Sequence, residues 1–180
     1  MAAATAAVLE LVRQNYVVCM LAGTGCGSHR GRSREATMTV KAILSVKGSD
    51  VATIEPTASL ESAAKLLSER RVGALVVLGA DRRIVGILSE RDIVRTLAKR
   101  GAAALVEPLA QIMTREVITC KQSDTVAEIM EWMTTGKFRH VPVVENDRLA
   151  GIVSIGDVVK HRLHEMEREQ EALRDYIQTA

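Results

Sequence analysis

One short pattern occurs twice in the chain, as IVGILSERDIV (residues 84–94) and as LAGIVSIGDVV (residues 149–159). The two copies align without a gap, so that a glycine, a serine and an aspartate each recur 65 residues later. An apolar run that reaches Ser-x-x-Asp and then becomes apolar again is typical of a strand leading directly into a helix. The repetition predicts a protein built from two like units.

The sequence before each copy repeats as well, now with an offset of 66 residues. Apolar residues at i, i+3, i+4 and i+7 predict one amphipathic helix per unit. They are Leu60, Ala63, Ala64 and Leu67 in the first unit and Val126, Ile129, Met130 and Met133 in the second. Thr125 and Glu128 have the spacing of a capping box at the start of the second of these helices. Buried-strand runs follow at residues 72–78 and 141–144, each ending in turn residues.

Each unit is therefore predicted to run strand, helix, strand, strand, helix. Thr53 and Thr119 correspond to each other just before the first helix of each unit, and Cys120 is expected to be a small core residue in a strand. We predict an α/β (α+β) fold, in which two β-α-β-β-α units pack with pseudo-twofold symmetry. Because one such unit buries little surface alone, the two should pack together and leave a cleft suited to a ligand.

The predicted boundaries follow from the same patterns. Residues 38–104 form the first unit and 105–164 the second, and 165–180 form a C-terminal amphipathic helix that packs on the module or on a partner. Residues 1–37 are an N-terminal extension, and residues 23–37 have the glycine, serine and arginine content of a flexible linker. Met38 begins the clear pattern and is a candidate translation start.

Composition argues against several classes of protein. The net charge is +2 with 24 basic and 22 acidic residues, and the whole excess lies in residues 1–37. A neutral body and only 2% aromatic residues disfavour nucleic-acid binding. Three cysteines at no zinc-finger spacing favour reduced thiols and a cytoplasmic location, and the apolar runs are too short to span a membrane.

The motifs GILSERD and GIVSIGD, each following a β-α-β-β pattern, resemble the paired repeats of the CBS-domain family, also called the Bateman module. The resemblance covers about residues 38–160. It implies a non-catalytic regulatory or sensor module that binds AMP, ADP, ATP, an NAD-type dinucleotide or S-adenosylmethionine between the repeats. It also implies a homodimer formed through the helical faces. We expect AMP first, with ATP, ADP or NAD(H) as alternatives and no metal.

Asp92 and Asp157 have two possible roles. A carboxylate at a helix start can accept hydrogen bonds from ribose hydroxyls while the helix N–H groups meet phosphate. Aspartate is equally a common cap of helix N-termini. Two aspartates in register after Gly-h-h-Ser favour the ligand role, and both roles can hold together.

The resemblance implies two unequal sites, since the aspartate of one repeat faces strand residues of the other in this family. The first, basic site would contain Ser89, Arg91 and Asp92 with Thr119, Arg139 and His140. The second, with less positive charge, would contain Ser154 and Asp157 with Thr53, Val72, Gly73 and Ala74. Neighbouring residues complete the predicted ligand-binding set: Glu90, Lys121, Phe138, Pro142, Ile155 and Gly156.

Three rival interpretations are weaker. An enzyme would need a catalytic domain beside the repeats, and Ser154, His140 and Asp157 show no order of nucleophile, base and orienting group. His161, His164 and Glu165 share a helical face that could bind a metal, although a solvated helix is the more common use of such residues. A structural interaction module with unoccupied pockets is the remaining alternative, although the paired Ser and Asp motifs argue against it.

Overall fold

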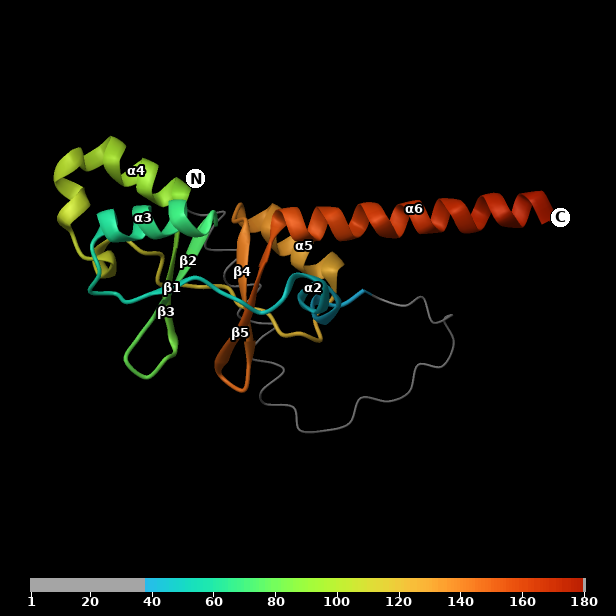
Figure 1. Ribbon diagram of the computed structural model, residues 1–180, viewed down its shortest axis with the longest axis horizontal. Helices are drawn as coiled ribbons and strands as arrows, with labels where there is room; N and C mark the ends of the chain where they lie inside the picture. Colours follow the sequence, from blue (N-terminus) through green and yellow to red (C-terminus); the bar gives the residue numbers. More distant parts are fainter. Residues whose placement is uncertain (1–37, 180) are drawn as a thin grey trace.

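The structure, a computed structural model, describes residues 38–179. The predictions for residues 1–37 therefore lie outside the described residues. The first repeat contains β1 (Thr53–Ile54), α3 (Leu60–Arg70), β2 (Ala74–Leu78), β3 (Ile84–Ser89) and α4 (Glu90–Arg100). The second contains α5 (Val126–Gly136), β4 (His140–Glu145), β5 (Arg148–Ser154) and α6 (Ile155–Thr179). Helix α2 (Val40–Lys47) precedes them, and two 3₁₀ helices, η1 (Ala102–Val106) and η2 (Leu109–Gln111), join the repeats (Figure 1).

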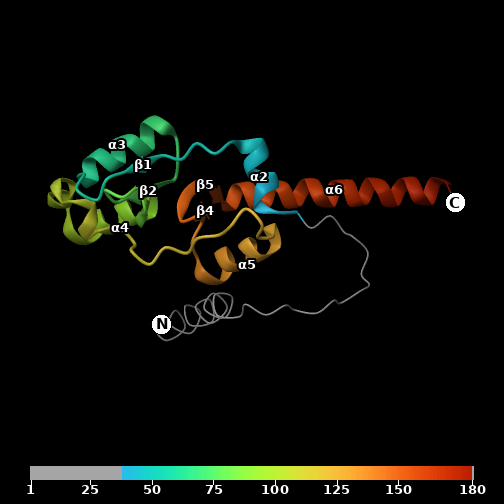
Figure 2. The same ribbon diagram turned by 90° about the horizontal axis from the view of Figure 1, so that it is seen from below.

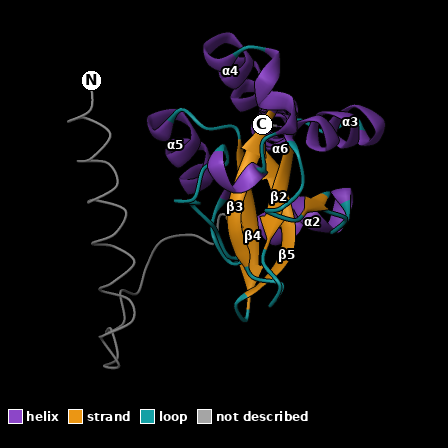
Figure 3. Cartoon of the chain, turned by 90° about the vertical axis from the view of Figure 1, so that its left-hand side faces the viewer, coloured by secondary structure: helices purple, strands orange, loops and turns teal. Residues whose placement is uncertain are grey.

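The strands run together through the middle of the molecule and the helices surround them (Figure 3). In the first repeat the strand order is β1-β2-β3, with β1 parallel to β2 and β3 antiparallel to it. In the second, β4 and β5 form an antiparallel hairpin. Ala74 pairs with Ser89 in one hairpin and His140 with Ser154 in the other, so the two hairpins have equivalent registers.

The first helix of each repeat is capped at its start, and the cap of the second repeat was predicted from the sequence. The Thr125 hydroxyl accepts from the Glu128 N–H at 3.2 Å, and the Thr125 N–H donates to the Glu128 carboxylate at 2.9 Å. The predicted capping box is confirmed. In α3, Ser59 accepts from the Ser62 N–H at 3.2 Å. These bonds satisfy N–H groups that an uncapped helix would leave without partners.

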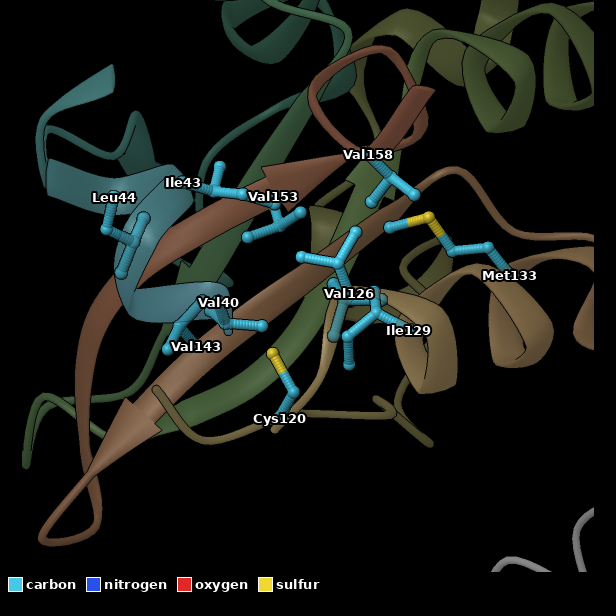
Figure 4. Close-up of a cluster of buried hydrophobic side chains, with 11 residues drawn as sticks. Val40, Ile43, Leu44, Cys120, Val126, Ile129, Met133, Val143, Val153 and Val158 are labelled. Carbon is cyan, nitrogen blue, oxygen red and sulfur yellow. The ribbon is translucent and has the colours of Figure 1, made fainter. Parts of the chain in front are cut away.

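Each repeat has its own aliphatic core. The first includes Leu60, Leu67, Leu75 and Leu88, all at most 4% exposed. The second includes Ile129, Met133, Val143 and Val153 together with three residues of α2, as the close-up in Figure 4 shows. The core residues of α3 and α5 lie on the predicted helical faces. The spacing of apolar residues in the sequence therefore predicted correctly which side of each helix is buried.

Helix α2 was not predicted, and it packs away from the repeat that follows it in sequence. Val40, Ile43 and Leu44 belong to the core of the second repeat, and Figure 2 shows α2 beside α6, β4 and β5. A Cβ on Gly151 would lie 2.8 Å from a Leu44 methyl carbon, so only glycine allows this close approach. At the equivalent Gly86, the segment at Met113 and Thr114 lies equally close.

Two further expectations are corrected. The strand expected before α5 is reduced to a single parallel bridge between Cys120 and Val143, although Cys120 is 1% exposed and is a core residue as predicted. Burial raises the pKa of its thiol to about 12. The last helix of the second repeat and the C-terminal amphipathic helix are one continuous helix, α6, because no residue between them breaks the helical pattern. None of the helices in residues 38–179 is both long and apolar enough to cross a membrane.

Candidate functional site

The two Ser-x-x-Asp turns stand where β3 meets α4 and where β5 meets α6, and their geometry is nearly the same. Asp92 Oδ2 accepts from the Ser89 N–H at 3.0 Å and from its hydroxyl at 2.6 Å. Asp157 Oδ2 accepts from the same groups of Ser154 at 2.8 and 2.7 Å. Each serine is therefore the N-cap of its helix, and each aspartate is the N3 residue of a capping box. The prediction that the aspartates are themselves N-caps was wrong by three positions, and their ligand role stays a prediction.

Lys47 distinguishes the second turn from the first. Its ammonium group lies 2.7 Å from Asp157 Oδ2 and donates to the Ile152 carbonyl at 3.1 Å. Burial would raise the pKa of Asp157, but the hydrogen bonds from Lys47 and Ser154 together lower it below its ordinary value. The partner of Asp92 is weaker, since Arg95 lies 3.7 Å from its other oxygen. Helix α2 thus brings one cation to the second site from outside both motifs, and the prediction that this site has less positive charge than the first stays a prediction.

His140 lies where the two repeats touch. A Cβ on Gly73 would be 3.1 Å from the His140 ring and 3.8 Å from the Glu90 carboxylate. Burial, and then the charge of Lys47, lower the pKa of His140, while the carboxylates of Glu90 and Asp157 act in the opposite direction. His140 was predicted for the first site only. The structure places it against residues of both predicted sites, so the two sites adjoin.

A pocket of about 360 Å³ lies between the repeats. Arg91 comes from the first turn of α4, and Lys137, Phe138 and Arg139 come from the loop between α5 and β4. Met133, Thr134 and Ile155 complete its lining. The pocket joins a cation of the first repeat to two cations of the second. Of the predicted basic site it brings together Arg91 and Arg139, whereas Ser89, Asp92, Thr119 and His140 are not part of its lining.

The remaining predicted residues lie around these groups. Glu90 and Ile155 begin α4 and α6, where their N–H groups donate to the carbonyls of Gly73 and Arg139 at 3.2 and 2.8 Å. Thr119 and Lys121 flank the bridge residue Cys120, whose N–H donates to the Pro142 carbonyl at 3.0 Å. The others are on or beside the strands and the start of α6: Thr53 in β1, Val72 just before β2, Ala74 in β2 and Gly156 in the first turn of α6. Of these remaining predicted residues, Ile155 alone lines the pocket of Arg91 and Arg139.

Sequence reasoning missed Lys47 and Lys137. Lys137 precedes the predicted residue Phe138, and its left-handed backbone (φ 56°) ends α5, so a helix-end signal could have found it. Lys47 could be found only by recognising α2, whose eight residues carry no side-chain N-cap hydrogen bond.

The rival chemistries receive no support from the geometry. The Ser154 hydroxyl bonds directly to Asp157, so His140 does not stand between them as the base of a hydrolytic triad would. Within residues 38–179, no group of three or more His, Cys, Asp or Glu side chains could hold a metal ion. Glu165, from the candidate metal face, is paired with Arg162 instead.

Two like units joined through a shared cleft define a protein of tandem α/β repeats. The model of the family described as "CBS domain" matches residues 40–99 and again 109–164. The chain therefore belongs to the CBS-domain family and carries a pair of these domains.

Known proteins agree with this assignment. The chain is 38% identical over 120 residues to the mitochondrial CBS-domain-containing protein CBSX3 of Arabidopsis thaliana, a match that covers 64% of this chain and 58% of that protein. A CBS-domain-containing protein of Agrobacterium tumefaciens is 49% identical, with a TM-score of 0.68, over 69% of this chain and 99% of that one.

Two further solved structures contain ligands. A CBS-domain protein of Pyrobaculum aerophilum, complexed with AMP, is 32% identical with a TM-score of 0.60, over 67% of this chain and 89% of that one. The CBS-domain pair of protein MJ0100, in complex with 5'-methylthioadenosine and S-adenosylmethionine, is 28% identical with a TM-score of 0.64, over 72% of this chain and 98% of that one. All three of these ligands contain adenosine.

Proposed function

We propose that this chain is a non-catalytic regulatory module that binds an adenine nucleotide, AMP first, in the cleft between its CBS repeats. The observation that carries the proposal is the pocket in which Arg91 of one repeat meets Lys137 and Arg139 of the other. Arginine recognises phosphate through paired hydrogen bonds, and lysine adds a point charge. The Ser89 and Asp92 turn begins the same helix as Arg91 and supplies a carboxylate for the ribose.

The charge of this pocket bears on the choice of ligand. Three cations favour a ligand with a phosphate over S-adenosylmethionine, whose sulfonium is positive. AMP is bound in one of the similar structures, and ATP, ADP and NAD(H) are the alternatives with the same adenosine phosphate group. Phe138 and the aliphatic parts of Met133 and Ile155 provide apolar surface in the pocket for the base.

The test is isothermal titration of the whole chain with AMP and with adenosine. Asp92→Asn should weaken both ligands alike, by about 1.5–3 kcal/mol, because a hydrogen bond to a charged group is lost. Asparagine keeps a side-chain oxygen that can accept from the Ser89 N–H, so the capping box and the fold should survive. Arg139→Ala should weaken AMP more than adenosine, because adenosine has no phosphate.

Arg148→Ala is the matched control, since Arg148 is an exposed arginine at the other end of the strand that carries Ser154. It should leave both affinities unchanged. Unchanged AMP affinity in both Asp92→Asn and Arg139→Ala would contradict the proposed site. If no adenine nucleotide bound at all, the structural interaction module would be the better interpretation.

The ion pair between Lys47 and Asp157 favours a second, narrower proposal, namely that the second site stays empty or accepts only a ligand that displaces or uses Lys47. A ribose at Asp157 would compete with an ammonium group already at 2.7 Å. Titration should therefore give one AMP per chain. Lys47→Met should raise this number if the ion pair closes the second site.

The wider role is part of the same proposal. The module would act in the cytoplasm as a homodimer, through the helical faces of the repeats, and would change the activity of a partner protein in response to nucleotide. It would have no turnover of its own. Steady hydrolysis of ATP by pure protein, lost in Asp92→Asn and Arg139→Ala, would contradict this.

A further inference from the structure

Helix α6 continues well past the second repeat, and Figure 1 shows it extending away from the body. Val158 is buried in the core of the second repeat. From the next residue onward a different face of the helix becomes apolar, about 100° further round. The large apolar residues on it are exposed: Val159, Leu163, Met166, Leu173 and Ile177, by 45 to 72%.

The spacing of these residues is that of a coiled-coil seam. Residues 159, 163, 166, 170, 173 and 177 alternate in steps of four and three, which is the repeat of a and d positions in a heptad. Gln170 occupies the one polar position of this seam. A helix that lies on a single domain usually has a wider apolar face than this narrow line. The pattern therefore indicates another helix as the partner.

The charges beside the seam select the partner and its direction. In a parallel pair of identical helices, a residue at g faces the residue five positions later in the other copy. Arg162 then faces Glu167 of the second copy, and Glu169 faces Arg174. Both pairs are attractive, and symmetry doubles them.

An antiparallel pair in the register that aligns the same seam would be repulsive. It would place Glu167 against Glu167 and Glu169 against Glu169 of the second copy, and Lys160 against Arg174. In the antiparallel pair, Gln170 would face Met166 of the second copy. In the parallel pair it faces Gln170 of the second copy, and such pairs of polar residues at position a fix the register of the two helices.

We propose that residues 159–177 of α6 form a parallel two-stranded coiled coil with a second copy of this chain. Leu173 at d and Ile177 at a are the residue types that favour two strands. This interface is separate from the nucleotide pocket and from the helical faces of the repeats. It does not depend on whether the module binds nucleotide.

The test uses disulfide cross-linking at residue 170, where the two copies meet face to face. The background carries Cys19→Ser and Cys26→Ser, so that the remaining native thiol, Cys120, is buried. Gln170→Cys should cross-link under mild oxidation. Adding either Glu169→Arg or Arg174→Glu should reduce the cross-linked fraction about fivefold or more, because attractive pairs become like-charge pairs.

Mixing the two charge variants should restore cross-linking, because one copy then carries only arginines and the other only glutamates at positions 169 and 174. Arg168→Glu, at the outward f position, is the matched control and should have no effect. Circular dichroism and AMP titration of each variant report whether the body is folded and whether the proposed nucleotide site works.

Two results would overturn the coiled coil. One is absence of cross-linking at residue 170 in folded protein, including protein that is dimeric through its repeats. The other is cross-linking that ignores the charge reversals, or that prefers Met166→Cys of one copy with Gln170→Cys of the other. Failure of AMP to bind would contradict the proposed function and leave this test unaffected.

Discussion

The two Ser-x-x-Asp turns are nearly identical in backbone and hydrogen bonding, yet their surroundings differ. Asp92 has only a distant arginine of its own helix, at 3.7 Å, whereas Asp157 holds Lys47 of α2 at 2.7 Å. The position of Ala74 in the first repeat is taken by His140 in the second, at equivalent places in the two hairpins. Repetition of the backbone therefore sets where a ligand could lie, and side chains from outside the motif make the two positions chemically unequal.

The largest effect is expected from removing α2 from the second core. Ile43 is 1% exposed, so Ile43→Ala should lower the free energy of unfolding by about 2–5 kcal/mol. The measurement is urea denaturation followed by circular dichroism. Val46→Ala is the control, because Val46 on the same helix is 77% exposed and its truncation should cost at most about 0.5 kcal/mol. Equal costs would mean that α2 contributes little to that core.

Truncating the two aspartates compares the turns directly. Asp92→Ala should cost about 1 kcal/mol of stability, because the hydrogen bonds from the Ser89 N–H and hydroxyl are lost. Asp157→Ala should cost more, since it also leaves Lys47 without its carboxylate partner. Chemical denaturation of both variants at neutral pH is the measurement. If the two losses were the same, the ion pair would contribute nothing and the asymmetry between the turns would be only geometric.

Lys47→Met isolates the ion pair and should lower stability by about 0.2–1 kcal/mol, as expected for partly exposed pairs. The pKa of Asp157 is lower in the folded protein than its ordinary value of 3.8. Its ionised form therefore stabilises the fold above that value, and the contribution disappears as the pH falls through the lowered pKa. Stability measured against pH should thus show wild type and variant converging in acid. A constant difference at every pH would indicate lost packing of the lysine chain instead.

The smallest effect concerns His140. Its pKa is lowered in the folded protein from 6.5. Near and below that pH, His140 therefore binds a proton more readily in the unfolded chain than in the folded chain. Stability should fall as the pH drops from about 7 to about 5, and His140→Gln should make this fall shallower. Guanidinium denaturation at the two pH values measures it. A fall of the same steepness in wild type and in His140→Gln would contradict the assignment.

Periodicity and repetition were enough to predict most of the fold. The helical faces of α3 and α5, both hairpins and both capped turns follow from local patterns, because buried faces must recur at 3.6 or 2 residues. Helix α2 could not be found this way, since it is short and its apolar face is covered by residues of the second repeat, between Cys120 and Val158. The bridge at Cys120 differs from the expected strand because extended residues there pair with β4 at only one position.

The candidate site was predicted less completely than the fold. Arg91 and Arg139 were expected together, and both line one pocket. Lys47 was missed, because its approach to Asp157 depends on how α2 packs rather than on any motif. Whether the predicted residues bind a nucleotide is a question for the titrations above.

The large sequence separation between α2 and the strand on which it packs has a kinetic consequence. Lys47 and the Ile152 carbonyl that it contacts are separated by 105 residues, and closing a loop of that length makes folding slow. During synthesis on the ribosome, the apolar residues of α2 emerge early. They remain exposed to solvent until β5 has been synthesised. The second repeat cannot complete its core before then. We therefore expect the second repeat and α2 to fold in one late, cooperative event, during which the nascent chain is most exposed to aggregation and to chaperones.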